Sequence, residues 1–213
     1  MAEDIRIDSH KLLYHPEVVA RWLKGETVYP IEIEVGLSGA CNHRCIFCAV
    51  DYMGYQPKFL DKEVLLSNLS ALAGKGLKSV IYSGEGEPLL NKNAPDIFNQ
   101  TKSYGVDVAM SSNGVLFSKE KAAACLKSFT WIRFSIAAAT EATYHDIQQG
   151  QPGDLAKVYQ NLADAVEVKH QQKMDVTLGA QLLLLQENKA EVAQLAKNWR
   201  EIGLNSLTVK PYS

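Results

Sequence analysis

Short apolar or β-branched runs alternate with amphipathic, helix-like segments along most of this chain. That alternation is typical of βαβ units, in which parallel strands form a sheet and the helices between them cover it. The runs of strand length are residues 31–35, 78–83, 106–110, 131–136, 176–185 and 207–210. We therefore predict an α/β fold with six parallel strands.

Capping residues and one-sided apolar patterns place helices between these runs. The residues expected to open helices are Asp61, Ser118, Asp154 and Asn188. Glu191 is expected to complete a capping box with Asn188, and Gly203 to end the helix that follows. These signals agree with the strand pattern and leave no long linker between elements.

The length of 213 residues, with 46% hydrophobic composition, suits one core rather than two. We expect residues 1–26 to form an N-terminal helical segment, with a helix in "PEVVARWLK" bounded by Gly25 and packed on the outside, and residues 27–213 to form one core domain. Because the sequence stops directly after the sixth strand, we expect a C-terminal extension that would close the barrel to be absent or truncated.

Charge and hydropathy disfavour some classes of function. A net charge of −2 and a pI near 6.2 lack the basic bias of a protein that tracks phosphates, so nucleic acid is not an expected partner. The N-terminus lacks the pattern of a signal peptide, and no apolar run is long enough for a membrane span. We expect a cytoplasmic protein, in which clustered cysteines are metal ligands or catalytic thiols rather than disulfides.

The conspicuous polar and glycine-rich segments all follow predicted strands. They are residues 38–52, 83–91 and 111–114, Ser135, and residues 211–213. In a parallel α/β barrel, ligands bind at the C-terminal ends of the strands, where the loops converge. Turn chemistry explains "SSNG" by itself, but the common position of these segments favours a shared site.

Three of the four cysteines lie in a C-x3-C-x2-C pattern, as Cys41, Cys45 and Cys48. Three thiolates can hold three irons of a four-iron cluster and leave the fourth iron open to a bound molecule. A structural zinc site completed by His43 or Cys125 is the alternative. Cys125 lies in "KAAACLK", where a small buried residue is expected.

"CNHRCIFC", with Phe47 before the last cysteine, resembles the cysteine motif of the radical S-adenosylmethionine (radical SAM) superfamily. "GEGEPLLN", "SSNG" and the six strands extend the resemblance over residues 27–213. It implies a partial (β/α)6, TIM-like barrel with a [4Fe-4S] cluster on Cys41, Cys45 and Cys48. It also implies that S-adenosyl-L-methionine is cleaved reductively to a 5′-deoxyadenosyl radical.

The resemblance further implies a binding site for S-adenosyl-L-methionine. Gly84 and Gly86 would let the backbone approach this cofactor, and Glu87 would accept a hydrogen bond from its methionine ammonium. Further contacts are implied for Ser112, Asn113 and Ser135 with the ribose, and for Phe47 and Leu183 with the adenine.

The sequence also departs from the usual family pattern. Glu85 stands between the two glycines and is expected to point away from the cofactor. Ala137 replaces a common aspartate, and Gln148 or Gln149 stands near a common arginine, which leaves the partner of the methionine carboxylate open. No cysteine follows Cys125, so the auxiliary (SPASM-type) clusters of the peptide-maturing branch are not expected.

The leading hypothesis is a radical SAM enzyme that abstracts hydrogen from an organic substrate, with a small molecule such as a sugar or nucleotide favoured. The expected electron donor is a protein such as flavodoxin or ferredoxin. The alternatives are a peptide- or protein-modifying radical SAM enzyme and a non-catalytic iron-sulfur or zinc-binding protein of the same fold. A ribosomal-RNA methyltransferase is disfavoured by the acidic balance and by the lack of a methyl-accepting cysteine near the C-terminus.

Overall fold

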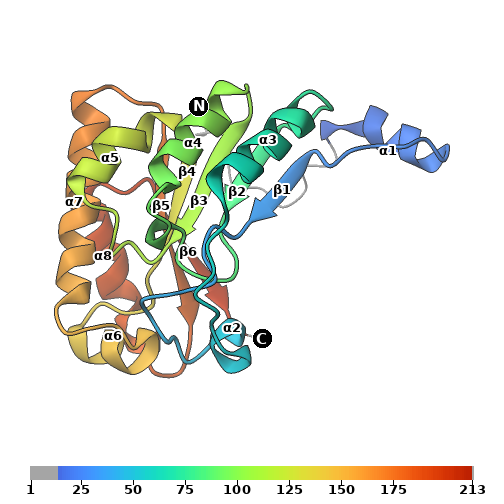
Figure 1. Ribbon diagram of the computed structural model, residues 1–213. Helices are drawn as coiled ribbons and strands as arrows, with labels where there is room; N and C mark the ends of the chain where they lie inside the picture. The colour runs from blue at the N-terminus through green and yellow to red at the C-terminus, as the bar shows by residue number, and fades with distance from the viewer. Residues whose placement is uncertain (1–13, 213) are drawn as a thin grey trace.

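Six parallel strands form one sheet in the computed structural model, which describes residues 14–212 (Figure 1). The strands follow one another across the sheet in chain order. They are β1 (Glu32–Val35), β2 (Ser79–Tyr82), β3 (Asp107–Ser112), β4 (Phe129–Ser135), β5 (Thr177–Leu184) and β6 (Ser206–Pro211). Each predicted run overlaps one of these strands, so the predicted α/β fold and partial TIM-like barrel are confirmed.

Helices cover one face of this sheet, as Figure 1 shows. They are α3 (Lys62–Ala73), α4 (Ala94–Ser103), α5 (Lys119–Cys125), α7 (Asp154–Gln171) and α8 (Val192–Ile202). Two shorter helices, α2 (Ala49–Met53) and α6 (Glu141–Gln148), lie beyond the C-terminal ends of the strands. No helix among residues 14–212 is long and apolar enough to cross a membrane.

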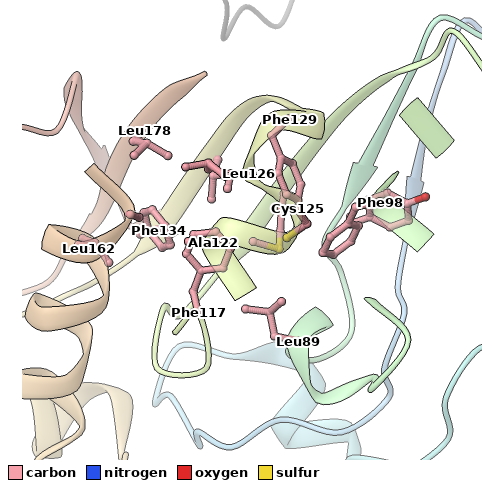
Figure 2. Packing of buried hydrophobic residues seen from close by; sticks show 14 of the residues in the cluster. Leu89, Phe98, Phe117, Ala122, Cys125, Leu126, Phe129, Phe134, Leu162 and Leu178 are labelled. Atoms are coloured by element: carbon pink, nitrogen blue, oxygen red, sulfur yellow. The ribbon is translucent and has the colours of Figure 1, made fainter. Parts of the chain in front are cut away.

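The apolar core fills the space between the sheet and its helices. Figure 2 shows Phe98 of α4, Phe117, and Phe129 and Phe134 of β4 in this layer, together with Cys125. The Cys125 thiol is fully buried and donates to the carbonyl of Lys121 at 3.1 Å, and burial raises its pKa to about 12. The prediction that Cys125 packs in the core is therefore confirmed.

The opposite face of the sheet carries mainly polar side chains. Side chains alternate between the two faces of a strand, so residues between the core positions of β2 to β5 point away from the helices. They include Ser79, Ser111, Arg133, Ser135 and Gln181. This face is the inner surface of the partial barrel, and we call it the lumen.

Several predicted helix boundaries are confirmed. Asp61 caps α3 by accepting a hydrogen bond from Val64 N at 3.0 Å, and Ser118 caps α5. Gly203 ends α8 with a φ of 96°, the left-handed conformation that glycine adopts without a steric penalty. Asp154 is the first residue of α7 rather than its cap, because Gly153 occupies the capping position.

The predicted capping box of Asn188 and Glu191 is wrong. The Asn188 side chain instead donates to the carbonyls of Ala137 and Leu183, each at 2.8 Å, and so fixes the loop after β5. A short 3-10 turn, η4 (Lys189–Glu191), precedes α8. The Glu191 carboxylate turns away from α8 and accepts from Ala139 N at 2.6 Å, near the start of α6. Asn188 and Glu191 thus bond to residues about fifty positions earlier in the chain instead of capping the helix that follows them.

The predicted N-terminal helix exists as α1 (Pro16–Leu23), but its expected packing on the outside of the domain is wrong. None of its residues is buried, and Figure 1 shows it beyond the β1 edge of the sheet. Arg21 pairs instead with Glu26, with Nε and Oε2 2.8 Å apart, which joins the helix to the segment that follows it. Residues 1–13 of the predicted segment lie outside the described residues.

Candidate functional site

The loops after β1 to β4 surround one pocket at the C-terminal edge of the sheet. It is lined by Cys41, His43, Cys45, Phe47, Cys48, Tyr55, Ser83, Gly84, Glu85, Gly86, Glu87, Ser111, Ser112, Asn113, Ser135 and Gln148. Ten of the eleven site residues predicted from the sequence are in this set, and Leu183 is not. A neighbouring pocket brings Leu184 and Leu185, rather than Leu183, next to Phe47.

The cysteine loop is held in place by the C-terminal end of α6. Ile46 N donates to Ile147 O at 2.9 Å, and Arg44 N donates to Gln148 O at 3.2 Å. The last carbonyls of a helix have no partner within it, so they are available to an adjacent loop. The loop therefore takes its position from the end of a helix that lies about a hundred residues later in the chain.

Arg44 and Tyr55 hold the two ends of the cysteine motif together. The Arg44 guanidinium donates to the carbonyls of Cys41 and His43 and lies 4.6 Å from the centre of the Tyr55 ring. The Tyr55 hydroxyl lies 3.2 Å from Cys48 Sγ. Tyr55 thus covers a thiol, whereas Tyr52 is 96% exposed.

Burial and the neighbouring thiols oppose the ionisation of Cys41 and Cys45. Burial raises the pKa of Cys45 to about 12, and the neighbouring Cys41 and Cys48 add to the effect. Burial also raises the pKa of Cys41. Because thiolates are the metal-binding form, loading a metal here must release protons and supply compensating positive charge.

The arrangement of donors fits a cluster better than a single ion. Among residues 14–212, no three His, Cys, Asp or Glu side chains converge on one ion position. His43 and Cys125 therefore do not complete a tetrahedral zinc site, since His43 Nε2 lies 3.6 Å from Asp154 Oδ2 and Cys125 is in the core. A [4Fe-4S] cluster offers a separate iron to each thiolate, which suits three sulfurs placed around one pocket.

Glu87 joins the loops after β2 and β3. Its side chain is 2% exposed, and its carboxylate accepts from Leu89 N, from Ser112 Oγ at 2.9 Å and from Asn113 N at 2.9 Å. Burial raises its pKa, while these hydrogen bonds act in the opposite direction. A carboxylate has about four acceptor positions, so one remains for a ligand donor.

The two glycines of the "GEGEP" turn are required for different reasons. Gly84 has a φ of +105°, which residues with a Cβ rarely adopt. A Cβ on Gly86 would lie 2.2 Å from Ala40 O and 2.5 Å from Ser38 O. Gly86 thus lets this turn pack against the start of the cysteine loop. Glu85 between them is exposed and also lines the pocket, so its expected orientation away from the cofactor stays a prediction.

Ser112 and Asn113, predicted to contact a ribose, also make contacts within the protein. Ser112 Oγ donates to Glu87 and accepts from Gly114 N. Asn113 Nδ2 donates to Asn42 Oδ1 at 2.7 Å, which joins the loop after β3 to the cysteine motif. Ribose contacts by these residues remain a prediction.

Gln148 has a positioning role that the sequence did not reveal. Its side chain accepts from Ala137 N at 2.7 Å and donates to Ser135 O at 3.2 Å, while its carbonyl accepts from the Cys45 thiol at 3.7 Å. It therefore links the end of β4 to the cysteine loop. The departures at Ala137 and Gln148 were visible in the sequence, but only the fold shows that these two positions are bonded to each other.

The family profile of the Radical SAM superfamily matches residues 35–199. The chain belongs to the radical SAM superfamily. Members of this superfamily use a [4Fe-4S] cluster and S-adenosyl-L-methionine, which agrees with the thiol pocket described above. The three motif cysteines of this chain are the residues that fit the cluster.

Two curated relatives act on nucleotide-related compounds, as their names state. The GTP 3′,8-cyclase of Desulforamulus reducens is 25% identical over 179 residues, which are 81% of this chain and 53% of that protein. The 7-carboxy-7-deazaguanine synthase of Rhodopirellula baltica is 30% identical over 113 residues, which are 53% of this chain and 43% of that protein. The chain thus spans about half the length of these relatives.

Two solved structures illustrate the likeness of fold. SuiB of Streptococcus suis, bound to the precursor peptide SuiA, superposes with a TM-score of 0.74 at 15% identity, over all of this chain and 46% of SuiB. TYW1 with a lysine-pyruvate adduct gives a TM-score of 0.68 at 17% identity, over 97% of this chain and 82% of TYW1. At these identities the likeness concerns the fold alone.

Proposed function

We propose that this enzyme cleaves S-adenosyl-L-methionine reductively and uses the product to abstract hydrogen from a small organic substrate, with a nucleotide-related compound favoured. The observation that carries the proposal is the single pocket that brings Cys41, Cys45 and Cys48 together with Glu87 and the glycine turn. The cluster, when bound, supplies the electron that breaks a carbon-sulfur bond and yields the 5′-deoxyadenosyl radical.

The residues of the chain have distinct roles in this proposal. Cys41, Cys45 and Cys48 hold three irons, and Tyr55 shields Cys48 from water. Glu87 is held by Ser112 and by Asn113 N with one acceptor position left, which suits the ammonium of the methionine part. Its position is therefore set before any ligand arrives.

Two further parts of the site would hold the nucleoside of S-adenosyl-L-methionine. Ser135 lines the same pocket from the end of β4, where a ribose hydroxyl would lie. Phe47 lines the adjoining pocket with Leu184 and Leu185, which offers apolar surfaces for an adenine. Leu184 and Leu185 replace Leu183 in this proposal.

The substrate class is proposed from the relatives. Those named above are a GTP 3′,8-cyclase and a 7-carboxy-7-deazaguanine synthase, and both names denote chemistry on a purine-like compound. The resemblance to peptide-bound SuiB is one of fold at 15% identity, so it does not favour a peptide substrate. We propose flavodoxin or ferredoxin as electron donor, since the three cysteines are half-buried and lie close to the surface.

The proposal is tested by anaerobic reconstitution with iron and sulfide, reduction, and measurement of 5′-deoxyadenosine formed from added S-adenosyl-L-methionine. Cys45→Ala should lose both the visible absorbance of the cluster and the product. Cys125→Ala removes a thiol from the core and should keep both. A wild-type protein that binds zinc but no cluster, or a Cys45→Ala variant that still forms product, would refute the proposal.

A further inference from the structure

The lumen contains a group of polar side chains below the cofactor pocket that none of the roles above uses. In the register of the sheet, Arg133 of β4 lies beside Ser111 of β3 and Gly179 of β5, and Ser135 lies beside Gln181. Arg133 and Gln181 are therefore diagonal neighbours on the same face. Ser135, two residues after Arg133, lines the cofactor pocket, so Arg133 lies roughly 7 Å below it along the strand.

Two atoms of this group are buried without a partner. Arg133 Nε and Gln181 Oε1 make no hydrogen bond within the part of the chain that the structure describes. Most buried polar atoms in proteins are paired, and leaving one unpaired costs about 1–3 kcal/mol. These two atoms are thus available to a ligand rather than committed to the fold.

The lumen is arranged differently at the level of Ser79 and Asp107, two side-chain levels below Arg133. Ser79 Oγ donates to Glu32 Oε2 at 2.7 Å, and Thr130 Oγ1 donates to Asp107 Oδ1 at 3.2 Å. Polar side chains there pair across neighbouring strands. Unpaired buried atoms at the level of Arg133 and Gln181 are therefore a local feature and not a general property of the lumen.

Small residues lie beside Arg133 on both neighbouring strands, and Ser206 Oγ lies 2.7 Å from the position that a Cβ on Gly179 would occupy. The neighbours of Arg133 in register are glycine and serine, the smallest side chains available, and its guanidinium carbon lies 5.6 Å from the centre of the Trp131 ring below it. Burial lowers the pKa of Arg133, and the charge of Glu34 opposes this shift. An arginine remains charged even so, which leaves a cation facing the lumen.

Glu34 supplies an acceptor of opposite charge on the β1 side. Its carboxylate accepts from Ser83 Oγ, and its Oε1 lies 3.7 Å from the position that a Cβ on Gly84 would occupy. Glu34 therefore lies directly beneath the glycine turn of the cofactor site. The lumen thus presents a guanidinium on β4, an amide oxygen on β5 and an exposed carboxylate on β1, and Glu34 is near enough to Arg133 for its charge to act on the guanidinium.

We propose that Arg133, Gln181 and Glu34 form the substrate subsite, with a carboxylate or phosphate of the substrate on Arg133 and its N–H donors on Gln181 and Glu34. This inference rests on the proposed function, because it places the substrate between Arg133 and the cofactor pocket. Planar guanidinium groups bind carboxylates and phosphates through paired hydrogen bonds. The glutamine oxygen and the glutamate select for N–H groups such as those on the edge of a purine-like ring.

Equilibrium binding to the reconstituted, unreduced enzyme with S-adenosyl-L-methionine tests this subsite. The probes are two pairs that differ in charge, GTP with guanosine and 7-carboxy-7-deazaguanine with 7-deazaguanine. We expect the anionic member of one pair to bind at least about tenfold more tightly than its neutral partner. The pair that shows this preference distinguishes a phosphate from a carboxylate.

Three variants separate the contribution of Arg133 to binding the anion from that of Gln181 to binding the N–H groups. Arg133→Met should abolish the preference for the anion, whereas the matched control Arg200→Met, on the exposed side of α8, should keep it. Gln181→Leu should weaken both members of the preferred pair equally, because they share the N–H edge. Preference for neither anion in the wild type, or a preference that survives Arg133→Met, would overturn the subsite.

The unfolding temperature is a second measurement, and it would change if Arg133 had a structural role. Arg133 Nε has no partner to lose, so Arg133→Met should unfold at the same temperature as the wild type or higher, and a fall of several degrees would make Arg133 a structural residue. The proposed function fails separately, through absence of a cluster or of 5′-deoxyadenosine. The subsite proposal fails separately if the cluster and 5′-deoxyadenosine are both present but the preference for the anion does not depend on Arg133.

Discussion

The Oε2 atom of Glu87 accepts a hydrogen bond from the backbone N–H of Asn113 at 2.9 Å, so one buried side chain joins the turns after β2 and β3. Glu87→Gln places an amide where three donors converge, and at least one of them must face another donor. We expect a loss of about 2 kcal/mol in unfolding free energy, together with weaker binding of S-adenosyl-L-methionine. Urea unfolding and equilibrium binding measure the two effects.

Glu85→Gln is the matched control for that change, since Glu85 is an exposed carboxylate in the same turn. It should leave the free energy of unfolding within about 0.5 kcal/mol of the wild type. Equal losses in the two variants would show that the buried hydrogen bonds of Glu87 do not organise the site.

Gly86→Ala should prevent the start of the cysteine loop from packing against the glycine turn. The new Cβ would meet the carbonyl oxygen of Ala40 at 2.2 Å, and backbone on both sides leaves little room to adjust. We expect most of the iron to be lost after anaerobic reconstitution, measured as iron per chain. Gly74→Ala, at a helix end where the nearest atom is 3.5 Å away, should reconstitute like the wild type. Normal iron content in Gly86→Ala would contradict this account of the turn.

Gln148→Leu should destabilise the backbone directly after β4. Ala137 N–H is buried and bonded to Gln148 Oε1, so the substitution leaves a buried donor unpaired and costs about 2 kcal/mol. Amide hydrogen exchange at Ala137 should become faster, while Gln151→Leu, an exposed glutamine nearby, should not change it. Unchanged protection of the Ala137 amide from hydrogen exchange in Gln148→Leu would mean that the backbone after β4 does not depend on this hydrogen bond.

Glu191 should make stability depend on pH. Burial tends to raise its pKa, but hydrogen bonds from Thr143, Ala139 and Thr140 outweigh that effect and lower it. A carboxylate with a lowered pKa in the folded state stabilises the fold above its unfolded pKa of about 4.3, and this contribution disappears as the pH falls through the folded pKa.

Glu191→Gln should accordingly reduce the free energy of unfolding at pH 7 by about 1 kcal/mol or less, since the carboxylate is partly screened by solvent. The difference from the wild type should shrink as the pH falls below about 4. Urea unfolding at several pH values measures it. A difference that stays constant over this range would show that the charge of Glu191 is not the cause.

The strands and the cysteine site were predictable because their signals are local. A run such as residues 176–185 shows its strand character by itself, and C-x3-C-x2-C places three thiols together whatever the rest of the chain does. Glycines and Glu87 in a turn after a strand also share one edge of a parallel sheet by topology.

The errors concern side chains whose partners lie far along the chain. Asn188 and Glu191 match the local pattern of a capping box, but Asn188 bonds to Ala137 and Glu191 to Ala139, about fifty residues earlier. The role of Gln148 depends on the contact between β4 and α6, which no local pattern reveals.

Helix α6 is held at both ends by groups that belong to other parts of the molecule. Glu191 accepts hydrogen bonds from the backbone N–H groups of Ala139 and Thr140, directly before the first residue of the helix, and the cysteine loop donates to the carbonyls of Ile147 and Gln148 at the last turn of the helix. With eight residues and a rise of about 1.5 Å each, it is a stiff spacer roughly 12 Å long. Displacement of the loop after β5 is therefore passed to the cysteines, so the two sides of the pocket shift as one unit.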